Sequence, residues 1–309
     1  MSDALVIEDV RKRYGLRGPW ALDGLSCSVP TGSICGLIGP NGAGKTTLFS
    51  VICGFLPADS GRVDVLGAGV FDPWVHKARL GALPQDALLP DRSTCRDFLR
   101  FMGMLQGMTG VEARSATEDA LMKVDLRERA DMVIANLSHG MRRRLSTASA
   151  LLGTPELVLL DEPTAGLDPV QARQLRHQLV ALRGQTTLVI SSHNLAELER
   201  ICDHVIFIEA GRCLRQGSLD ALTRAGQTLR WGLGPGPVPL DALHAALPEH
   251  RFTLEEIEGA RTLSHHAPLS ADVDAATLVV MGALAQAGVP LRDLRRGQSL
   301  EESYIEGRG

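Results

Sequence analysis

The sequence predicts an α/β protein whose core is a mostly parallel β-sheet, followed by a smaller α+β domain. The composition favours buried aliphatic strands, because 44% of the 309 residues are hydrophobic and only 4% are aromatic. Short apolar runs at 34–38, 157–160 and 186–190 have the length of such strands. A chain of this length can bury a large core and is typical of two domains.

Alternation, turn residues and helical spacing give the other elements of the first domain. Strands are expected at 5–13, 25–29, 60–66 and 80–83, with turns at Gly18-Pro19 and Pro30-Thr31-Gly32. The segment 94–129 is expected to be mainly helical, because apolar residues recur along it in stripes. A further helix follows the run at 34–38, with apolar residues at Leu48, Val51, Ile52 and Phe55.

A glycine-rich loop joins the first apolar run to that helix: Gly39-Pro40-Asn41-Gly42-Ala43-Gly44-Lys45-Thr46-Thr47. It fits the pattern G-x-x-x-x-G-K-[ST], in which glycines let backbone N–H groups turn inward around a phosphate. The following helix adds the unpaired donors of its N-terminus. Lys45 would reach the β- and γ-phosphates, and the Thr46 hydroxyl would complete a Mg²⁺ shell. Strand, loop and helix together predict a site for a nucleoside triphosphate.

Two adjacent acids, Asp161 and Glu162, follow the second apolar run. Ligands of open α/β sheets bind at the carboxyl ends of the strands. Asp161 can hold the Mg²⁺ shell through water, and Glu162 can polarise an attacking water. Gln85 and His193 follow two other expected strands. They could be an exposed amide and a structural histidine, but the shared edge favours Gln85 as a contact of the metal and the water, and His193 as part of the site.

A second candidate phosphate site is the helix start at Ser138, within the segment 136–145. The serine could be an ordinary helix N-cap. The functional alternative is a phosphate-binding helix N-terminus aimed at a nucleotide that another subunit holds. The run Arg142-Arg143-Arg144 is expected to be a solvated or interface face. No aromatic residues interleave it, as a nucleic-acid patch would require.

Composition excludes several classes of protein. The net charge of −4 gives no reason to expect nucleic acid or an anionic membrane as a partner. The six cysteines show no metal-binding spacing, which favours a reduced thiol set and the cytoplasm. No signal peptide is expected at the start. The uncharged runs at 24–44 and 275–291 are interrupted by glycine and proline and are expected not to span a membrane. His265-His266 could ligate a metal, but no third ligand lies nearby in the sequence.

In order and spacing, these motifs resemble those of an ATP-binding cassette (ABC) ATPase from about residue 4 to 222. They include the segment 137–141, the run 160–163 and the turn 165–168. The resemblance implies a P-loop NTPase core with an antiparallel β subdomain and a helical subdomain at about 90–152, and it implies ATP and Mg²⁺ as cofactors. Two departures stand out: the family usually has glycine where this chain has His139, and glutamine where it has Met141. The departure at His139 affects how closely the backbone could approach a phosphate at that position.

The resemblance also implies a role for each residue. Tyr14, which could otherwise be a packing residue, stacks on the adenine. Residues 39–47 cradle the phosphates, and Asp161 serves Mg²⁺. Glu162 is the general base. Gln85 and His193 contact the γ-phosphate of the same site. The γ-phosphate of the opposing subunit's ATP is bound by Ser138 and Gly140, with Met141 beside them. Asp168 lines the dimer seam.

The segment 223–309 is expected to be a separate regulatory or assembly domain. Its strands and helices are expected in the order β-α-β-β-α-β, at 228–233, 240–247, 251–257, 261–265, 271–287 and 289–294. That order is ferredoxin-like. A terminal helix is expected at 299–305. The segment resembles the tail of bacterial export-type cassettes related to antibiotic-resistance and multidrug transporters, and we find no catalytic cluster in it.

Two functions remain open at this point. The first is the ATPase subunit of an exporter, pairing with a second copy of itself and a separately encoded membrane permease on the inner face of the cell membrane. The second is a soluble cassette ATPase in DNA repair, chromosome organisation or translation. The second class usually carries a long coiled coil between the phosphate loop and Ser138, or two cassettes in one chain. Neither feature is present, which favours the transporter.

Overall fold

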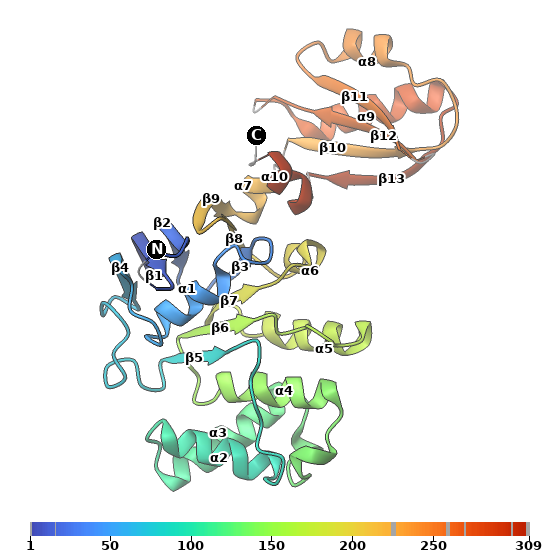
Figure 1. The fold of residues 1–309 in the computed structure, drawn as a ribbon. Helices are drawn as coiled ribbons and strands as arrows, with labels where there is room; N and C mark the ends of the chain where they lie inside the picture. The colour runs from blue at the N-terminus through green and yellow to red at the C-terminus, as the bar shows by residue number, and fades with distance from the viewer. Residues whose placement is uncertain are drawn as a thin grey trace. The chain divides into compact units, whose positions relative to one another are not determined.

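The structure is a computed structural model that describes residues 2–15, 17–223, 227–257, 260–268, 270–297 and 299–306. The chain divides into two compact units, Met1–Gly217 and Ser218–Gly309 (Figure 1). The division falls slightly before the boundary expected at 222, because the short helix α7 (Leu219–Thr223) packs against α10 (Leu300–Glu306) of the second unit.

The first unit contains two sheets. The larger has the strand order β5-β6-β7-β3-β8-β9, and the smaller has the order β2-β1-β4. The strands are β1 (Asp3–Arg13), β2 (Trp20–Pro30), β3 (Ile34–Ile38), β4 (Ser60–Val65), β5 (Leu80–Leu83), β6 (Leu157–Asp161), β7 (Thr187–Ser191), β8 (His204–Glu209) and β9 (Arg212–Ser218). The pairs of the larger sheet from β5 to β8 are parallel, which confirms the predicted fold class.

Strands β3, β6 and β7 are buried along their whole length, as expected for a parallel sheet covered on both faces. Since parallel strands end at one edge, β3, β5, β6 and β7 deliver the segments after Ile38, Leu83, Asp161 and Ser191 to the same side of the sheet. The helices of this unit are α1 (Lys45–Ile52), α2 (Cys95–Leu105), α3 (Gly110–Lys123), α4 (His139–Ala150), α5 (Pro169–Val180) and α6 (Leu195–Glu199). Short 3₁₀ turns lie at Arg127–Arg129 and Ile134–Asn136.

The antiparallel sheet and the helical segment agree with the prediction. Leu5, Leu25 and Val63 of the antiparallel sheet share a core with Leu48 and Ile52 of α1. The segment 94–129 forms α2 and α3, each started by a threonine N-cap. The cap of α3 is a complete capping box.

The prediction that Phe55 belongs to the apolar stripe of α1 is wrong. Gly54 has φ +71°, and the amide of Phe55 bonds to the carbonyl of Ser50 while that of Gly54 bonds to Val51. This is a Schellman ending, which terminates the helix before Phe55. The Phe55 side chain is consequently exposed.

The second unit is ferredoxin-like, as predicted. Its elements are α7, β10 (Thr228–Leu233), α8 (Leu240–Ala246), β11 (Arg251–Ile257), β12 (Ala260–His266), α9 (Val273–Gln286), β13 (Leu291–Arg296) and α10. The sheet order is β11-β12-β10-β13, and its pairs are all antiparallel. Trp231 and Leu263 of the sheet pack with Val280 and Leu284 of α9 and Leu243 of α8. The last strand lies two residues later than expected.

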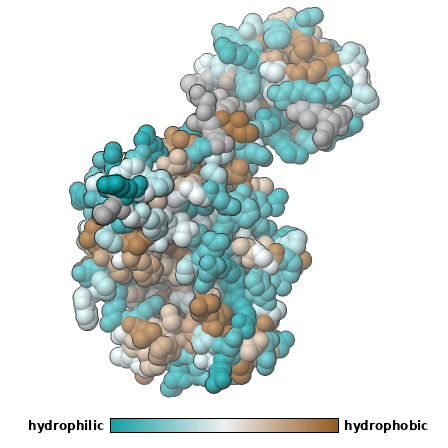
Figure 2. Space-filling view, in the orientation of Figure 1, coloured by the Kyte–Doolittle hydropathy of each residue, from teal (hydrophilic) through white to brown (hydrophobic). Residues whose placement is uncertain are grey.

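Among the described residues, none of the helices combines the length and the apolar character needed to cross a bilayer. The uncharged run at 275–291 lies largely in α9, which buries Ala276, Val280 and Leu284 as a core helix. On the visible face of the first unit, Figure 2 shows hydrophobic residues interspersed with hydrophilic ones. All six cysteines are free thiols, and five of them are buried.

Candidate functional site

A cavity of about 560 Å³ lies at the carboxyl edge of the parallel sheet. It brings together most of the residues predicted for the triphosphate site, and Ala21 and Ala165 complete its wall. The lining residues are Tyr14, Ala21, Asn41, Gly42, Ala43, Gly44, Lys45, Thr46, Thr47, Gln85, Asp161, Glu162, Ala165 and His193. Ser138, Gly140, Met141 and Asp168 are not among them, so the chain separates its two candidate phosphate-binding surfaces.

The glycine-rich loop needs its glycines for two physical reasons. Gly44 has φ +108°, a conformation that side chains disfavour, and a Cβ there would lie 2.5 Å from the carbonyl oxygen of Ala21. A Cβ on Gly39 would lie 2.3 Å from the carbonyl oxygen of Ile208 on β8. The loop is thus pressed against the sheet. Because Gly44 is the N-cap of α1, no side chain caps the first amides of that helix, which suits a bound phosphate.

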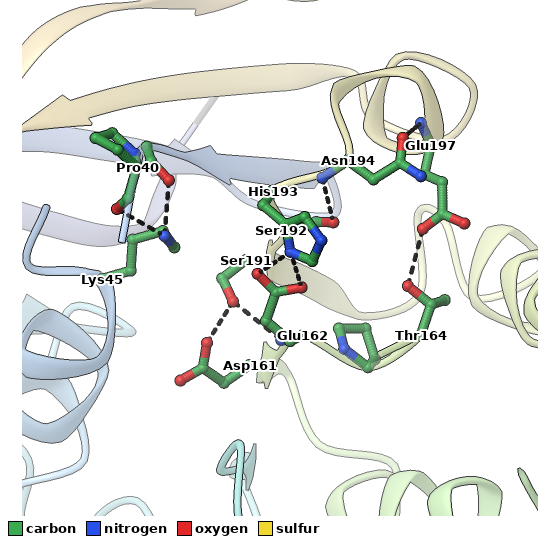
Figure 3. A network of polar contacts seen from close by, with 12 residues as sticks. Pro40, Lys45, Asp161, Glu162, Thr164, Ser191, Ser192, His193, Asn194 and Glu197 are labelled. Atoms are coloured by element: carbon green, nitrogen blue, oxygen red, sulfur yellow. Dashed lines mark hydrogen bonds and ion pairs between the residues drawn. The ribbon is translucent and has the colours of Figure 1, made fainter. Parts of the chain in front are cut away.

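Lys45 is buried at the start of α1, and its ammonium group crosses the loop. Its Nζ donates to the carbonyl oxygens of Gly39, at 2.7 Å, and Pro40, at 3.2 Å (Figure 3). These bonds keep the cation in the cavity wall, beside the loop amides. A buried ammonium with flexible donors is well suited to a phosphate group.

Asp161, which is 2% exposed, is held from two sides. The hydroxyl of Thr46 donates to its Oδ2 at 3.0 Å, and the hydroxyl of Ser191 donates to its Oδ1. The hydroxyl of Thr46 and the carboxylate of Asp161 are the hard oxygen donors that Mg²⁺ prefers, so the residues fit the predicted ion. Sequence reasoning assigned no role to Ser191. Its position at the end of a strand beside the acids was the available signal.

The side chains of Glu162 and His193 both line the cavity and point toward each other (Figure 3). The Nδ1 atom of His193 lies 3.0 Å from each carboxylate oxygen of Glu162. The Glu162 side chain is 11% exposed, whereas that of His193 is 72% exposed. An exposed histidine is therefore paired with a carboxylate that is nearly enclosed.

The backbone of Glu162 is strained. Its φ is +49°, which for a residue with a side chain costs about 1–3 kcal/mol and persists only where the surroundings enforce it. Ser191 supplies part of that constraint, because its hydroxyl and its carbonyl oxygen lie 3.0 and 3.2 Å from the Glu162 amide nitrogen. Strained residues of this kind cluster at active sites.

Tyr14 is not a core packing residue, because it is 59% exposed. Its hydroxyl lies 3.1 Å from the Thr47 hydroxyl, which fixes the ring at the rim of the cavity. The predicted stacking on adenine remains a prediction, and an exposed ring held at this rim is compatible with it.

The helix start at Ser138 has the capping geometry of the structural alternative. Ser138 is the N-cap of α4, and its Oγ accepts from the amide of Met141 at 3.2 Å. A Cβ on Gly140 would lie 1.6 Å from Oε1 of Gln171, so any side chain at this position would require the Gln171 side chain to move. His139 is exposed, and its imidazole lies over Gly166 of the turn 165–168, where a Cβ would be 2.6 Å from Nε2. Capping and phosphate binding are compatible at one serine.

Asp168 lies in the same region and caps a helix. Its Oδ1 accepts from the amides of Val170 and Gln171, at 2.9 Å each, which starts α5. Gln171 is also the residue that packs against Gly140. The turn 165–168 and the start of α4 are thus neighbours within one chain.

The expectation that Arg142-Arg143-Arg144 forms a solvated or interface face is wrong for two of its members. Arg142 pairs with Asp91 on the surface, as expected. Arg143 and Arg144 instead donate to backbone carbonyls. The carbonyls that accept from Arg144 belong to Val124 and Asp125. Burial lowers the pKa of the Arg143 guanidinium, and the nearby Asp161 and Glu162 carboxylates oppose this.

A second polar network holds the segment behind His193 (Figure 3). Glu197 on α6 accepts from the Thr164 hydroxyl at 2.8 Å and from Arg176 on α5 at 2.5 Å. Asn194 caps α6 directly after His193. The loop after Glu162 and the loop that carries His193 are therefore tied together through Glu197.

Comparisons with known proteins agree with this geometry. The family model "ABC transporter" matches residues 22–165. The chain is 34% identical over 311 aligned positions to the daunorubicin resistance ATP-binding protein DrrA3 of Streptomyces coeruleorubidus, covering 99% of this chain and 96% of that protein. It is 39% identical to the Nod factor export ATP-binding protein I of Burkholderia orbicola, covering 78% and 80%.

A solved structure described as the ATP-binding subunit of an ABC transporter superposes with a TM-score of 0.64 at 28% identity, covering 72% of this chain and 92% of that one. Sequence similarity along nearly the whole chain, together with the shared fold, settles the assignment. The chain belongs to the ABC transporter family, in which it is an ATP-binding subunit.

Proposed function

We propose that this chain hydrolyses ATP with Mg²⁺ and thereby powers export through a separately encoded membrane permease. The observation that carries the proposal is the convergence of Lys45, Asp161 and the Glu162–His193 pair on one cavity. Relatives that align with most of the chain are named for drug resistance and Nod factor export, which favours an exporter. The soluble alternative in DNA repair or translation is not favoured by these names.

Each part of the cavity has a proposed task. The loop amides and Lys45 hold the phosphates, and Thr46 and Asp161 hold Mg²⁺, which shields the charge of the β- and γ-phosphates. Glu162 accepts the proton of the attacking water, since its carboxylate is nearly enclosed and points into the cavity. His193 orients that carboxylate and contacts the γ-phosphate. Gln85, which follows the neighbouring strand β5 at the same edge of the sheet, would contact the metal and the water.

We propose further that two copies close around ATP. Ser138 and Gly140 lie outside the lining of the cavity in their own chain. The start of α4, with Met141 and Asp168 nearby, would then bind the γ-phosphate held by a second copy, as the family resemblance implies. This accounts for a glycine at 140 and an exposed cap at 138 in a part of the chain that has no nucleotide of its own.

The permease would place the chain on the inner face of the cell membrane, in the cytoplasm. The second unit, 218–309, would act in regulation or assembly. Its core is separate from that of the first unit, and none of its described residues lines the cavity.

The test has two parts. Purified chain should release phosphate from Mg-ATP, and the release should require Mg²⁺. Tagged chain expressed with the membrane proteins encoded beside it should co-purify with one of them from detergent-solubilised membranes, and drug efflux should require both. If the chain releases phosphate but no membrane protein co-purifies with it, the result would support the enzyme activity and contradict the role in transport. Absence of both would contradict the proposal as a whole.

A further inference from the structure

We propose that Arg143 is a positioning residue for ATP hydrolysis, because its guanidinium fixes the backbone that carries the proposed base Glu162. The inference deepens the proposed function and rests on it. Arg143 lies on α4, one turn after Ser138. Its hydrogen bonds to described residues in the cavity region all go to backbone oxygens, so it acts through Glu162 and not on the substrate.

The guanidinium of Arg143 uses all three of its nitrogens. Nη2 donates to the carbonyl oxygens of Asp161, at 2.7 Å, and Glu162, at 2.6 Å. Nε donates to Pro163 at 3.2 Å, and Nη1 donates to Gln85 at 3.0 Å. A planar fork of donors can hold several carbonyls in fixed directions, which an ammonium on a flexible stem cannot.

These bonds complete the constraint on a strained residue. Glu162 has φ +49°, and its amide is held by Ser191 on one side. Its carbonyl is held by Arg143 on the other side, so both peptide groups around the strained Cα are fixed. Without Arg143, the backbone would be free to relax toward a commoner φ, and the carboxylate would turn away from His193. A misplacement of about 1 Å in such a group can cost on the order of 100-fold in rate.

The same guanidinium joins three segments that the proposed cycle uses. It ties the helix that starts at Ser138 to the end of β6 and to the segment after β5 that carries Gln85. A displacement at the start of α4 would therefore reach the backbone of Glu162 through one side chain. This gives α4, proposed to bind the partner's nucleotide, a direct connection to the cavity of its own chain.

The test compares Arg143→Met with Arg144→Met in the full-length chain. Methionine keeps much of the volume but has no donors. Arg144 is the matched control, since it also lies on α4 and donates to two backbone carbonyls, those of Val124 and Asp125, which lie outside the cavity lining. ATP binding, kcat, KM and thermal unfolding are measured for both. Amide hydrogen exchange over 161–167 is followed without ATP, so that this readout does not depend on hydrolysis.

For Arg143→Met we expect a kcat that is about 10- to 100-fold lower, ATP affinity within about threefold of wild type, and faster exchange over 161–167. Arg144→Met should keep kcat within about threefold and leave that exchange unchanged. Unchanged kcat and exchange in Arg143→Met, equal losses in both variants, or a raised KM at unchanged kcat would overturn the inference.

Arg143→Lys covers the case in which the methionine variant does not fold. Lysine keeps the charge but loses the fork, so kcat should fall between the wild-type and methionine values, with intermediate exchange. Wild-type kcat in a folded Arg143→Lys would refute the role. If the wild type itself binds ATP without hydrolysing it, the proposed function fails, and the exchange comparison still decides whether Arg143 fixes the backbone.

Discussion

His193 places one ring nitrogen, Nδ1, at the same distance of 3.0 Å from both carboxylate oxygens of Glu162. Because one nitrogen lies equally close to both oxygens, the contact fixes the orientation of the carboxylate relative to the imidazole ring. Glu162 directly follows β6, with φ +49°, and His193 lies two residues after the end of β7. The pair is thus positioned by two neighbouring strand ends at one edge of the sheet.

The first prediction separates binding from turnover. Lys45→Ala removes a buried charge-assisted donor, which should weaken ATP binding about 10- to 100-fold. Glu162→Gln keeps a carbonyl oxygen that His193 can contact but removes the base, so ATP binding should persist while kcat falls at least about 100-fold. Equilibrium binding of a fluorescent ATP analogue and phosphate release measure the two effects. Wild-type turnover in both variants would sink the assignment of the site.

The second prediction concerns the departure at His139. This residue lies at the exposed start of α4, and its imidazole lies over Gly166 of the turn 165–168. Replacing His139 with glycine removes this cover and lets a phosphate approach the backbone more closely. We expect His139→Gly, in the Glu162→Gln background, to tighten ATP-dependent dimerisation several-fold. Met141→Gln is the control, because it restores the family's other usual residue without altering backbone access. Sedimentation at several protein concentrations gives the dissociation constants. Weaker or unchanged dimerisation in His139→Gly would show that the imidazole does not obstruct the site.

The third prediction concerns a shortened chain that ends at Gly217. The two units have separate hydrophobic cores, and the cavity-lining residues that the structure describes all belong to the first. The first unit alone should therefore hydrolyse ATP within about threefold of the full chain's basal rate. Circular dichroism establishes that it folds, and phosphate release gives the rate. A folded first unit that binds ATP and cannot hydrolyse it would show that the second unit takes part in catalysis.

The fourth prediction concerns pH. Burial, and next the neighbouring His250, lower the pKa of His265 to about 4. His265 is fully buried, and its ring stacks on those of Phe252 and His250. Its Nε2 lies 2.6 Å from Nδ1 of His250. The unfolded chain binds the proton at pH values below about 6.5, whereas the folded chain resists it until about 4.

The sign follows from this difference. Neutral His265 makes its full contribution to the free energy of unfolding above pH 6.5. As the pH falls toward 4, the free energy of unfolding decreases by roughly 3 kcal/mol in total. Thermal unfolding of the second unit should move to lower temperature over that range. In His265→Phe, which keeps the stacked ring, the decline should be distinctly shallower. The same slope in the variant and the wild type would mean that another group controls the transition.

The sequence predicted those parts of the site that depend on strand ends. Asp161, Glu162, Gln85 and His193 could be placed together because parallel strands finish at one edge, and the glycine-rich loop has a pattern of its own. The Schellman ending that excluded Phe55 also had a local signal, Gly54, which the helical spacing obscured.

Arg143 and Ser191 were missed for a different reason. An arginine in a basic run on a helix has the pattern of a solvated face, and nothing local shows that its guanidinium meets four carbonyls from two distant segments. Ser191 acts on Asp161 only because β6 and β7 are neighbours, with Asp161 directly opposite Ser191. Contacts of this kind depend on tertiary placement, which periodicity does not encode.

The last prediction concerns the dimer. Ser138 is exposed and caps α4 outside the cavity of its own chain, so the proposed γ-phosphate contact must come from a second copy. In the proposed dimer, two phosphate-binding surfaces rich in helix N-termini would repel each other until ATP supplied negative charge between them. Hydrolysis would then remove the bridging γ-phosphate, so that the nucleotide state would shift an open–closed equilibrium.

Glu162→Gln should arrest this cycle after closure, and that variant should be a dimer in saturating Mg-ATP and a monomer without nucleotide. Adding Ser138→Arg should abolish the dimer, because a long side chain would fill the space of the γ-phosphate. Asp91→Ala, which breaks only the surface pair with Arg142, is the control and should leave dimerisation intact. Light scattering coupled to size exclusion measures the mass in each state. A Glu162→Gln protein that stays monomeric in Mg-ATP, even with His139→Gly, would show that closure of this chain requires its membrane partner.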